Sequence, residues 1–158
     1  MLVKLYDLPA DASAPDRCLA SGIRIRCPMP YEKSGVLDMI RREFGTGWAD
    51  EAGTAFSWQP IRCVIATEQG RIVGFAAYDT TARGFFGPTG VLCSHRGRGI
   101  GKALLLASLR ALAERGYAYA IIGQAGEKAR QFYAKTVGAT LIPGSDPGIY
   151  RDRLTPAE

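Results

Sequence analysis

The segment that most constrains the fold of this chain runs over residues 100–115. Leucines and alanines cover nearly the whole circumference of the helix that its spacing predicts, and Gly116 ends that helix. A helix that is apolar on almost every side has to be buried. Because strand-like segments precede and follow it, we expect this helix to pack heavily against a β-sheet.

Several other segments have the composition of strands for that sheet. Residues 23–27 alternate apolar and basic side chains, the pattern of a half-buried strand. Residues 61–67 and 72–78 are two β-rich runs joined by a short glycine-containing connection, which predicts a hairpin. The remaining strands are expected over residues 84–93, 117–122, 139–142 and 148–154.

The predicted strand over residues 84–93 is irregular. It carries Gly87, Pro88 and Gly90 near its middle. Proline cannot donate a hydrogen bond to a neighbouring strand, and glycine permits close approach of the backbone. We therefore expect a bulge or a splay in this part of the sheet.

Two further segments have helical periodicity. Apolar residues recur three and four apart over residues 34–44, with Ser34 as a candidate N-cap and Gly45 as a candidate stop. Residues 127–137 have the same periodicity, and Gly138 ends them. Together with the strands, these helices predict a mixed α/β fold.

The length and composition fit a single domain. A chain of 158 residues that is 47% hydrophobic can bury one core. Residues 1–21 begin with a Pro-, Ala- and Asp-rich stretch, so we expect a loosely packed lead-in with one strand at its edge, and a domain over residues 22–158. Residues 48–58 fit either a second short helix or a loop over the substrate side.

Composition also argues against several classes of protein. The apolar stretches are much shorter than the ~20 residues that span a bilayer, and the N-terminus lacks a signal-peptide pattern, so we expect a cytoplasmic protein without a membrane partner. The four cysteines form no Cys-x-x-Cys pair and His95 is the only histidine, so no metal is expected. The net charge of +5 suits an anionic ligand, but no nucleic-acid-binding signature occurs.

The turn Arg96-Gly97-Arg98-Gly99-Ile100-Gly101 lies between a predicted strand and the buried helix. The first N–H groups of a helix lack partners within the helix and bind anions. Glycines let the backbone approach such a ligand, while Arg96, Arg98 and Lys102 supply positive charge. The turn therefore predicts a site for a phosphate group.

Two common phosphate-binding motifs do not fit this turn. A P-loop would need Ser or Thr after Gly101-Lys102, and Ala103 cannot ligate magnesium. The dinucleotide fingerprint would need its last glycine where Lys102 stands. A nucleotide-binding module of another kind remains an alternative.

The turn resembles the acyl-CoA loop of the GCN5-related N-acetyltransferase (GNAT) superfamily, whose signature is Gln/Arg-x-x-Gly-x-Gly/Ala. Residues 96–101 match that signature at each defined position, and the order of elements resembles the family over residues 22–154. A second family block matches at Ala129, Phe132, Tyr133 and Gly138. It departs from the family at Gly126, where asparagine is usual, and at Ala139, where phenylalanine is usual.

The resemblance implies the acyl-CoA N-acyltransferase fold. That fold has a mixed, mostly antiparallel central sheet of six to seven strands, a V-shaped splay between the fourth and fifth strands, and about four flanking helices. It also implies direct transfer of an acetyl group from acetyl-CoA to a primary amine of a small molecule, peptide or protein, without a covalent enzyme intermediate. A homodimer is common in the family.

The resemblance assigns roles to particular residues. Tyr133 becomes the general acid for the departing thiolate. Backbone groups of the fourth strand become contacts of the pantetheine arm. The cofactor-binding set is Val91, Cys93, Arg96, Gly97, Arg98, Gly99, Ile100, Gly101 and Lys102.

Four points stay open at the level of sequence. The general base is Asp79, Glu43, Asp50, His95 or a chain of water molecules, because the fourth strand carries no carboxylate. The acyl group is acetyl or a longer one, and the acceptor is not identified. The alternative function is a non-catalytic acyl-CoA-binding sensor or accessory domain.

Overall fold

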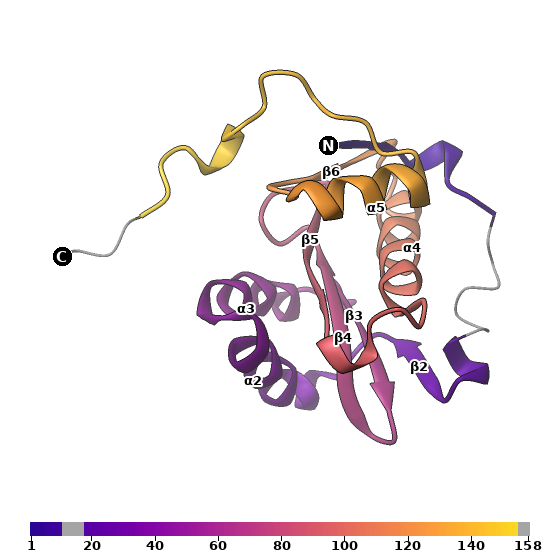
Figure 1. Ribbon diagram of the computed structural model, residues 1–158. Coiled ribbons are helices and arrows are strands. Elements are labelled where there is room, and N and C mark those ends of the chain that lie inside the picture. Colours follow the sequence, from indigo (N-terminus) through magenta and orange to yellow (C-terminus); the bar gives the residue numbers. More distant parts are fainter. Residues whose placement is uncertain (11–17, 155–158) are drawn as a thin grey trace.

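The computed structural model describes residues 1–10 and 18–154, which form one six-stranded sheet with helices on both faces (Figure 1). The strand order is β1-β6-β5-β4-β3-β2, and β5 with β6 is the parallel pair among otherwise antiparallel neighbours. The strands are β1 (Leu2–Lys4), β2 (Ile23–Arg26), β3 (Cys63–Glu68), β4 (Arg71–Tyr78), β5 (Phe85–Val91) and β6 (Tyr119–Ile122). The predicted mixed, mostly antiparallel sheet is confirmed.

Two pairs of helices cover the sheet (Figure 1). Helices α2 (Lys33–Phe44) and α3 (Thr46–Gly53) lie on one face, and α4 (Ile100–Glu114) and α5 (Glu127–Val137) lie on the other. The segment 48–58, for which sequence left two possibilities, continues α3 and then forms a short 3-10 helix, η3 (Thr54–Ser57).

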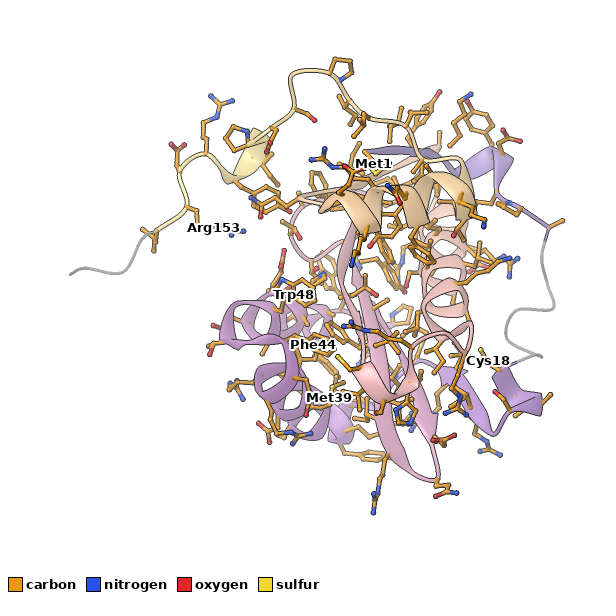
Figure 2. The ribbon with its side chains drawn as sticks, in the orientation of Figure 1. Met1, Cys18, Met39, Phe44, Trp48 and Arg153 are labelled. Atoms are coloured by element: carbon orange, nitrogen blue, oxygen red, sulfur yellow. The ribbon has the colours of Figure 1, made fainter. Side chains whose placement is uncertain are left out.

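Each face of the sheet has its own hydrophobic core. Helix α4 has eight buried residues, seven of which belong to one core, and Leu104, Leu105 and Leu106 are each at most 1% exposed. This confirms the helix that was expected to be buried on nearly every side. On the opposite face, Phe44 packs between Trp48 and Phe75, with ring centroids 5.7 and 5.5 Å away (Figure 2).

Strand β5 contains the predicted irregularity. Its pairing with β4 gains one residue between Thr89, opposite Ala76, and Phe86, opposite Tyr78. The extra residue falls at Gly87-Pro88, the position that sequence indicated. Strand β5 pairs with β6 only at Phe85 and Phe86, so the two strands diverge beyond this point and form the expected splay.

Residues 1–5 are part of the core. Strand β1 pairs with β6 at the sheet edge, Val3 is fully buried and Leu5 is 4% exposed. The expectation of loose packing is therefore wrong for these residues, because alternate side chains of an edge strand still face the core. The part of the lead-in over residues 11–17 lies outside the described residues.

The two strands expected at the C-terminal end are absent from the described residues. Thr140 makes a single bridge to Leu2, and Gly148–Tyr150 forms a 3-10 helix, η5. The outer edge of β1 is open to a further strand, but pairing there stops after Thr140, and Pro143 has no N–H group to donate to it. Gly144 and Gly148 have positive φ, which also breaks an extended conformation. Residues 141–154, here called the C-terminal arm, run away from α5 along the end of the sheet (Figure 1).

Within the described ranges, no helix combines the length and the apolar character that a membrane span requires.

Candidate functional site

A cleft of about 560 Å³ lies between the beginning of α4, the diverging part of β5, and α5. The turn before α4 forms one end of it, and the aromatic side chains of Phe86, Phe132 and Tyr133 lie along it. The splay between β5 and β6 opens this space, because no β6 backbone pairs with β5 after Phe86.

The turn presents backbone N–H groups to the cleft. Gly97 and Gly99 both have a φ of +79°, a conformation that glycine adopts without the steric cost of a Cβ atom. Gly99 caps α4 through its own carbonyl, which accepts from Ala103 N–H at 3.1 Å. The N–H groups of residues 100–102, before Ala103, have no acceptor within the helix. Such groups point along the helix axis and can bind an anion.

Basic side chains from the turn and from two helices add charge to the cleft. Arg96 comes from the turn, Lys102 from α4 and Lys128 from α5. Lys128 was not in the predicted cofactor-binding set, and the structure places it on the cleft wall.

The side chain of Arg98 lies elsewhere. Its guanidinium donates to the Glu68 carboxylate at 2.7 Å and to the Ser21 carbonyl at 3.1 Å. His95 Nε2 lies 2.9 Å from the other oxygen of Glu68. Arg98 and then His95 lower the pKa of Glu68 through these hydrogen bonds. Glu68, which sequence reasoning did not single out, thus ties the turn to the β3–β4 hairpin.

The backbone of Val91 faces the open edge of β5. Leu92 N–H donates to Val73 of β4 at 2.9 Å, so the alternation of an extended strand turns the groups of Val91 the opposite way. The Val91 carbonyl accepts there from Arg96 Nε at 3.2 Å. Cys93 follows in an exposed 3-10 turn, η4 (Cys93–His95), and does not line the cleft.

Tyr133 is the titratable aromatic residue of the cleft. It is 8% exposed, and its ring meets Phe86 edge to face at 6.0 Å and Phe132 at 5.3 Å. Burial raises the pKa of Tyr133 to about 12. The phenol therefore keeps its proton through the neutral range and can donate it in a hydrogen bond.

The sequence over residues 34–139 matches the model of the acetyltransferase (GNAT) family. That match covers more than half of the chain. The chain belongs to the GNAT acetyltransferase family. No curated protein matches the sequence.

Solved GNAT structures share the fold of this chain at low sequence identity. A fungal glucosamine N-acetyltransferase region of a multi-domain β-N-acetylglucosaminidase is 17% identical with a TM-score of 0.68, over 86% of this chain and 19% of that one. A GCN5-related N-acetyltransferase from Sphaerobacter thermophilus is 21% identical with a TM-score of 0.65, over 85% and 45%. A GNAT acetyltransferase from Brucella melitensis, in complex with acetyl-CoA, is 19% identical with a TM-score of 0.55, over 70% and 80%. The chain thus spans about a fifth of the length of the first protein and under half of the second.

In this GNAT chain, the candidate bases named from sequence are scattered. Asp79 is buried, pairs with Arg62 at 3.1 Å and accepts from Gly84 N–H at 2.6 Å, so it holds the β4–β5 turn. Glu43 pairs with Arg42 at 2.9 Å, and Asp50 is exposed on α3. Of the four candidates only His95 lines the cleft.

Two other cleft residues were not predicted as site residues. Thr89 and Leu105 line the cleft. Their signal in the sequence is position alone, because Thr89 follows the Gly87-Pro88 irregularity and Leu105 lies one turn into α4. Among the residues that the structure describes, no group of three His, Cys, Asp or Glu side chains could hold a metal ion.

Proposed function

We propose that this GNAT chain transfers an acetyl group from acetyl-CoA to a primary amine. The observation that carries the proposal is the continuity of the cleft, which joins an anion site at the start of α4 to the β5–β6 splay beside Tyr133. The acetyl-CoA complex of the Brucella relative supports the choice of donor.

The donor would lie along the cleft with its pyrophosphate on the turn. The first N–H groups of α4 would bind the phosphate oxygens, and Arg96, Lys102 and Lys128 would neutralise their charge. The set proposed for the cofactor remains Val91, Arg96, Gly97, Arg98, Gly99, Ile100, Gly101 and Lys102, and Cys93 is removed from it because it lies outside the cleft. Because the Arg98 side chain binds Glu68, its role would be to hold the turn in place.

The pantetheine arm would follow the open edge of β5. Val91 offers backbone groups on that edge, and this extended, hydrogen-bonding chain suits the amide groups of the arm. The thioester would then lie toward the apex of the splay, where Phe86 contacts Tyr133.

The reaction proposed is direct attack. The neutral amine forms a C–N bond to the thioester carbonyl carbon, and a backbone N–H stabilises the resulting oxyanion. When the C–S bond breaks, the Tyr133 hydroxyl donates to the departing sulfur and is reprotonated from solvent. The amine proton leaves to water, and the products are an acetamide and CoA.

Two measurements test this proposal. Acetyl-CoA at about 100 times its Kd should stabilise the folded chain by about 2.7 kcal/mol, whereas ATP and NAD should not stabilise it. Thiol release over a panel of primary amines, with the acetamide product identified by mass, should show turnover.

Each alternative has its own result in these measurements. Stabilisation by acetyl-CoA without turnover of any amine would favour the non-catalytic sensor. Stabilisation by ATP or NAD but not by acetyl-CoA would favour a nucleotide-binding module and contradict the proposed function.

A further inference from the structure

Three side chains from separate elements converge on the sheet face opposite the cleft. Glu51 belongs to α3, Thr81 to the β4–β5 turn, and Tyr150 to η5 in the C-terminal arm. Thr81 Oγ1 donates a hydrogen bond to the Glu51 carboxylate. The Tyr150 hydroxyl lies near both groups, since burial and then the charge of Glu51 raise its pKa while Thr81 lowers it. We call these three residues the Glu51 cluster.

The Glu51 cluster lies over the apex of the splay. Tyr150 packs directly on Gly123, where a Cβ atom would collide with its phenol. Gly123 directly follows Ile122, and Ile122 with Phe86 is the last β5–β6 pair before the strands diverge. On the β5 side, the hydroxyl of Thr80, the neighbour of Thr81, donates to the carbonyl of Gly87 at 2.8 Å. The apex therefore has Tyr133 on one side and the Glu51 cluster on the other.

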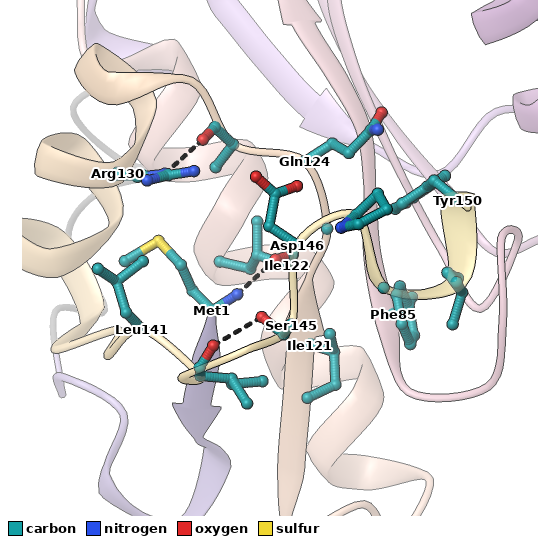
Figure 3. A pocket seen from close by; sticks show the side chains of 16 residues that line it. Met1, Phe85, Ile121, Ile122, Gln124, Arg130, Leu141, Ser145, Asp146 and Tyr150 are labelled. Carbon is teal, nitrogen blue, oxygen red and sulfur yellow. Dashed lines mark hydrogen bonds between the residues drawn. The ribbon is translucent and has the colours of Figure 1, made fainter.

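A second cavity, of about 280 Å³, shares Tyr150 with the Glu51 cluster and reaches Ile122 and Gly123 at the apex. It lies beneath the C-terminal arm, and Phe85, Ile121 and Ile149 give it mainly apolar walls. Figure 3 shows Tyr150 and Phe85 along one part of this cavity. Side chains alternate along a strand, so Phe85 faces this cavity while Phe86 faces Tyr133.

The C-terminal arm is held to the segment that follows β6. Arg153 lies over the Tyr150 ring at 5.2 Å and donates to Gln124 Oε1 at 3.0 Å. The guanidinium is thus held by Gln124, while the Glu51 carboxylate is held by the Thr81 hydroxyl. Glu51 remains partly exposed and can accept further hydrogen bonds.

We propose that the Glu51 cluster binds the ammonium group of the acceptor, and that the cavity under the C-terminal arm holds the apolar body of the same molecule. This inference rests on the proposed function. A primary ammonium has three N–H donors, and one carboxylate with two hydroxyl oxygens supplies a matching set of acceptors. The walls fit a compact alkyl- or arylamine rather than a polyhydroxylated aminosugar. The acceptor enters from the face opposite to the donor, and the two meet at the apex.

The test compares two amines and two carboxylates. The chain is assayed by thiol release with acetyl-CoA and either 2-phenylethylamine or glucosamine. Wild type should have a kcat/KM for 2-phenylethylamine at least 10-fold above that for glucosamine. Glu51→Gln should raise the KM for 2-phenylethylamine at least 10-fold, with little change in the KM for acetyl-CoA. Asp38→Asn, at an exposed carboxylate of α2 on the same face of the sheet, should leave both KM values unchanged.

The outcomes separate this inference from the proposed function. Failure of acetyl-CoA to bind overturns the proposed function. Binding of acetyl-CoA with a preference for glucosamine, or with acetylation of neither amine, overturns the substrate class. An equal KM for 2-phenylethylamine in Glu51→Gln and Asp38→Asn overturns the role of the cluster. Thermal melts of both variants confirm that they are folded.

Discussion

Tyr133 lines the cleft with a ring that is almost wholly buried against Phe86 and Phe132. The same burial that raises its pKa to about 12 makes it a weaker acid than an exposed phenol. Its contribution to catalysis is therefore a hydrogen bond to sulfur that strengthens as the C–S bond breaks, rather than early proton transfer.

Replacing Tyr133 with phenylalanine tests that role. Tyr133→Phe should lower kcat by 10- to 1,000-fold and leave the KM for acetyl-CoA within about 3-fold, because the ring contacts remain. Steady-state kinetics with the best amine of the panel measure both constants. Tyr31→Phe, on an exposed tyrosine, is the control. An unchanged kcat in Tyr133→Phe would exclude the phenol from the reaction.

The buried thiol of Cys63 should make the free energy of unfolding decrease as the pH becomes alkaline. Burial raises the pKa of this fully buried thiol to about 12, whereas an unfolded thiol ionises near its ordinary value of 9.0. The folded state therefore binds the proton more tightly, and the stability that this contributes is complete below pH 9 and lost as the pH rises toward 12. The expected loss from Cys63 is about 2 kcal/mol at pH 10.5.

Urea unfolding at pH 8 and pH 10.5 measures this effect. Cys63→Ala should lose less stability over that interval than wild type, and Cys93→Ala, at an exposed thiol, should lose as much as wild type. Tyr133 adds a similar loss only above pH 10, since its raised pKa has the same sign. Parallel pH dependences in wild type and Cys63→Ala would contradict the assignment.

At the scale of elements, the beginning of α4 and the diverging part of β5 form the proposed donor site together. The turn needs positive φ at Gly97 and Gly99 to direct its N–H groups into the cleft. Strand β5 needs Gly90 because the ring of Phe44 occupies the place of a side chain there. Both requirements can be tested by replacing the glycine with alanine, which adds one methyl group.

Gly99→Ala should weaken acetyl-CoA binding. Its φ of +79° costs an alanine about 1–2 kcal/mol, and relaxation would turn the N–H groups away from the phosphates. Gly116→Ala is the matched control, since Gly116 has a φ of +90° at the far end of α4 and similar open space around it. Both variants should lose similar stability in urea, but only Gly99→Ala should raise the Kd for acetyl-CoA, by about 10-fold. An equal effect of both on the Kd would show that binding follows stability alone.

Gly90→Ala should damage β5 itself. A Cβ atom there would lie 2.6 Å from two ring carbons of Phe44, and such overpacking costs about 1–3 kcal/mol. Gly35→Ala in α2 has open space and a helical backbone, so it should stabilise the chain by up to about 1 kcal/mol. Denaturant unfolding of the two variants should therefore give changes of opposite sign. A neutral Gly90→Ala would mean that Phe44 can move without cost.

At the scale of the whole molecule, the proposed donor site and the proposed acceptor site lie on opposite faces of the sheet. The donor cleft lies on the α4–α5 face, and the Glu51 cluster lies on the other. In the described residues, pairing between β5 and β6 stops after Phe86 and Ile122. The bulge at Gly87-Pro88 follows immediately in β5. Chemistry between two bound molecules is thus expected at the point where the sheet is least complete.

Sequence predicted the parts of this arrangement that depend on local patterns. The buried helix, the hairpin and the irregular strand each follow from spacing and from glycine or proline at fixed positions, as at Gly87-Pro88. The direction of the Arg98 side chain could not be predicted, because it depends on Glu68, which is 30 residues earlier in the chain. The Glu51 cluster was missed for the same reason, since its three members meet only in the folded molecule.

The predicted C-terminal strands failed for a different reason. Residues 139–142 have strand composition and reach the open edge of β1, but only Thr140 pairs there, with Leu2. Pro143 and Gly144 follow at once, and the pattern within residues 139–142 does not show that the pairing stops so early.

The pairing of β1 with β6 also sets an order of assembly. Strand β1 finds its neighbour β6 only after the other four strands and α4 have been made. Until then, its apolar side chains and those of the β6 edge have no partner, so the nascent chain stays open to association with other chains and with chaperones. Slow closure of this last seam, rather than formation of the hairpin, is expected to limit the rate at which the protein matures.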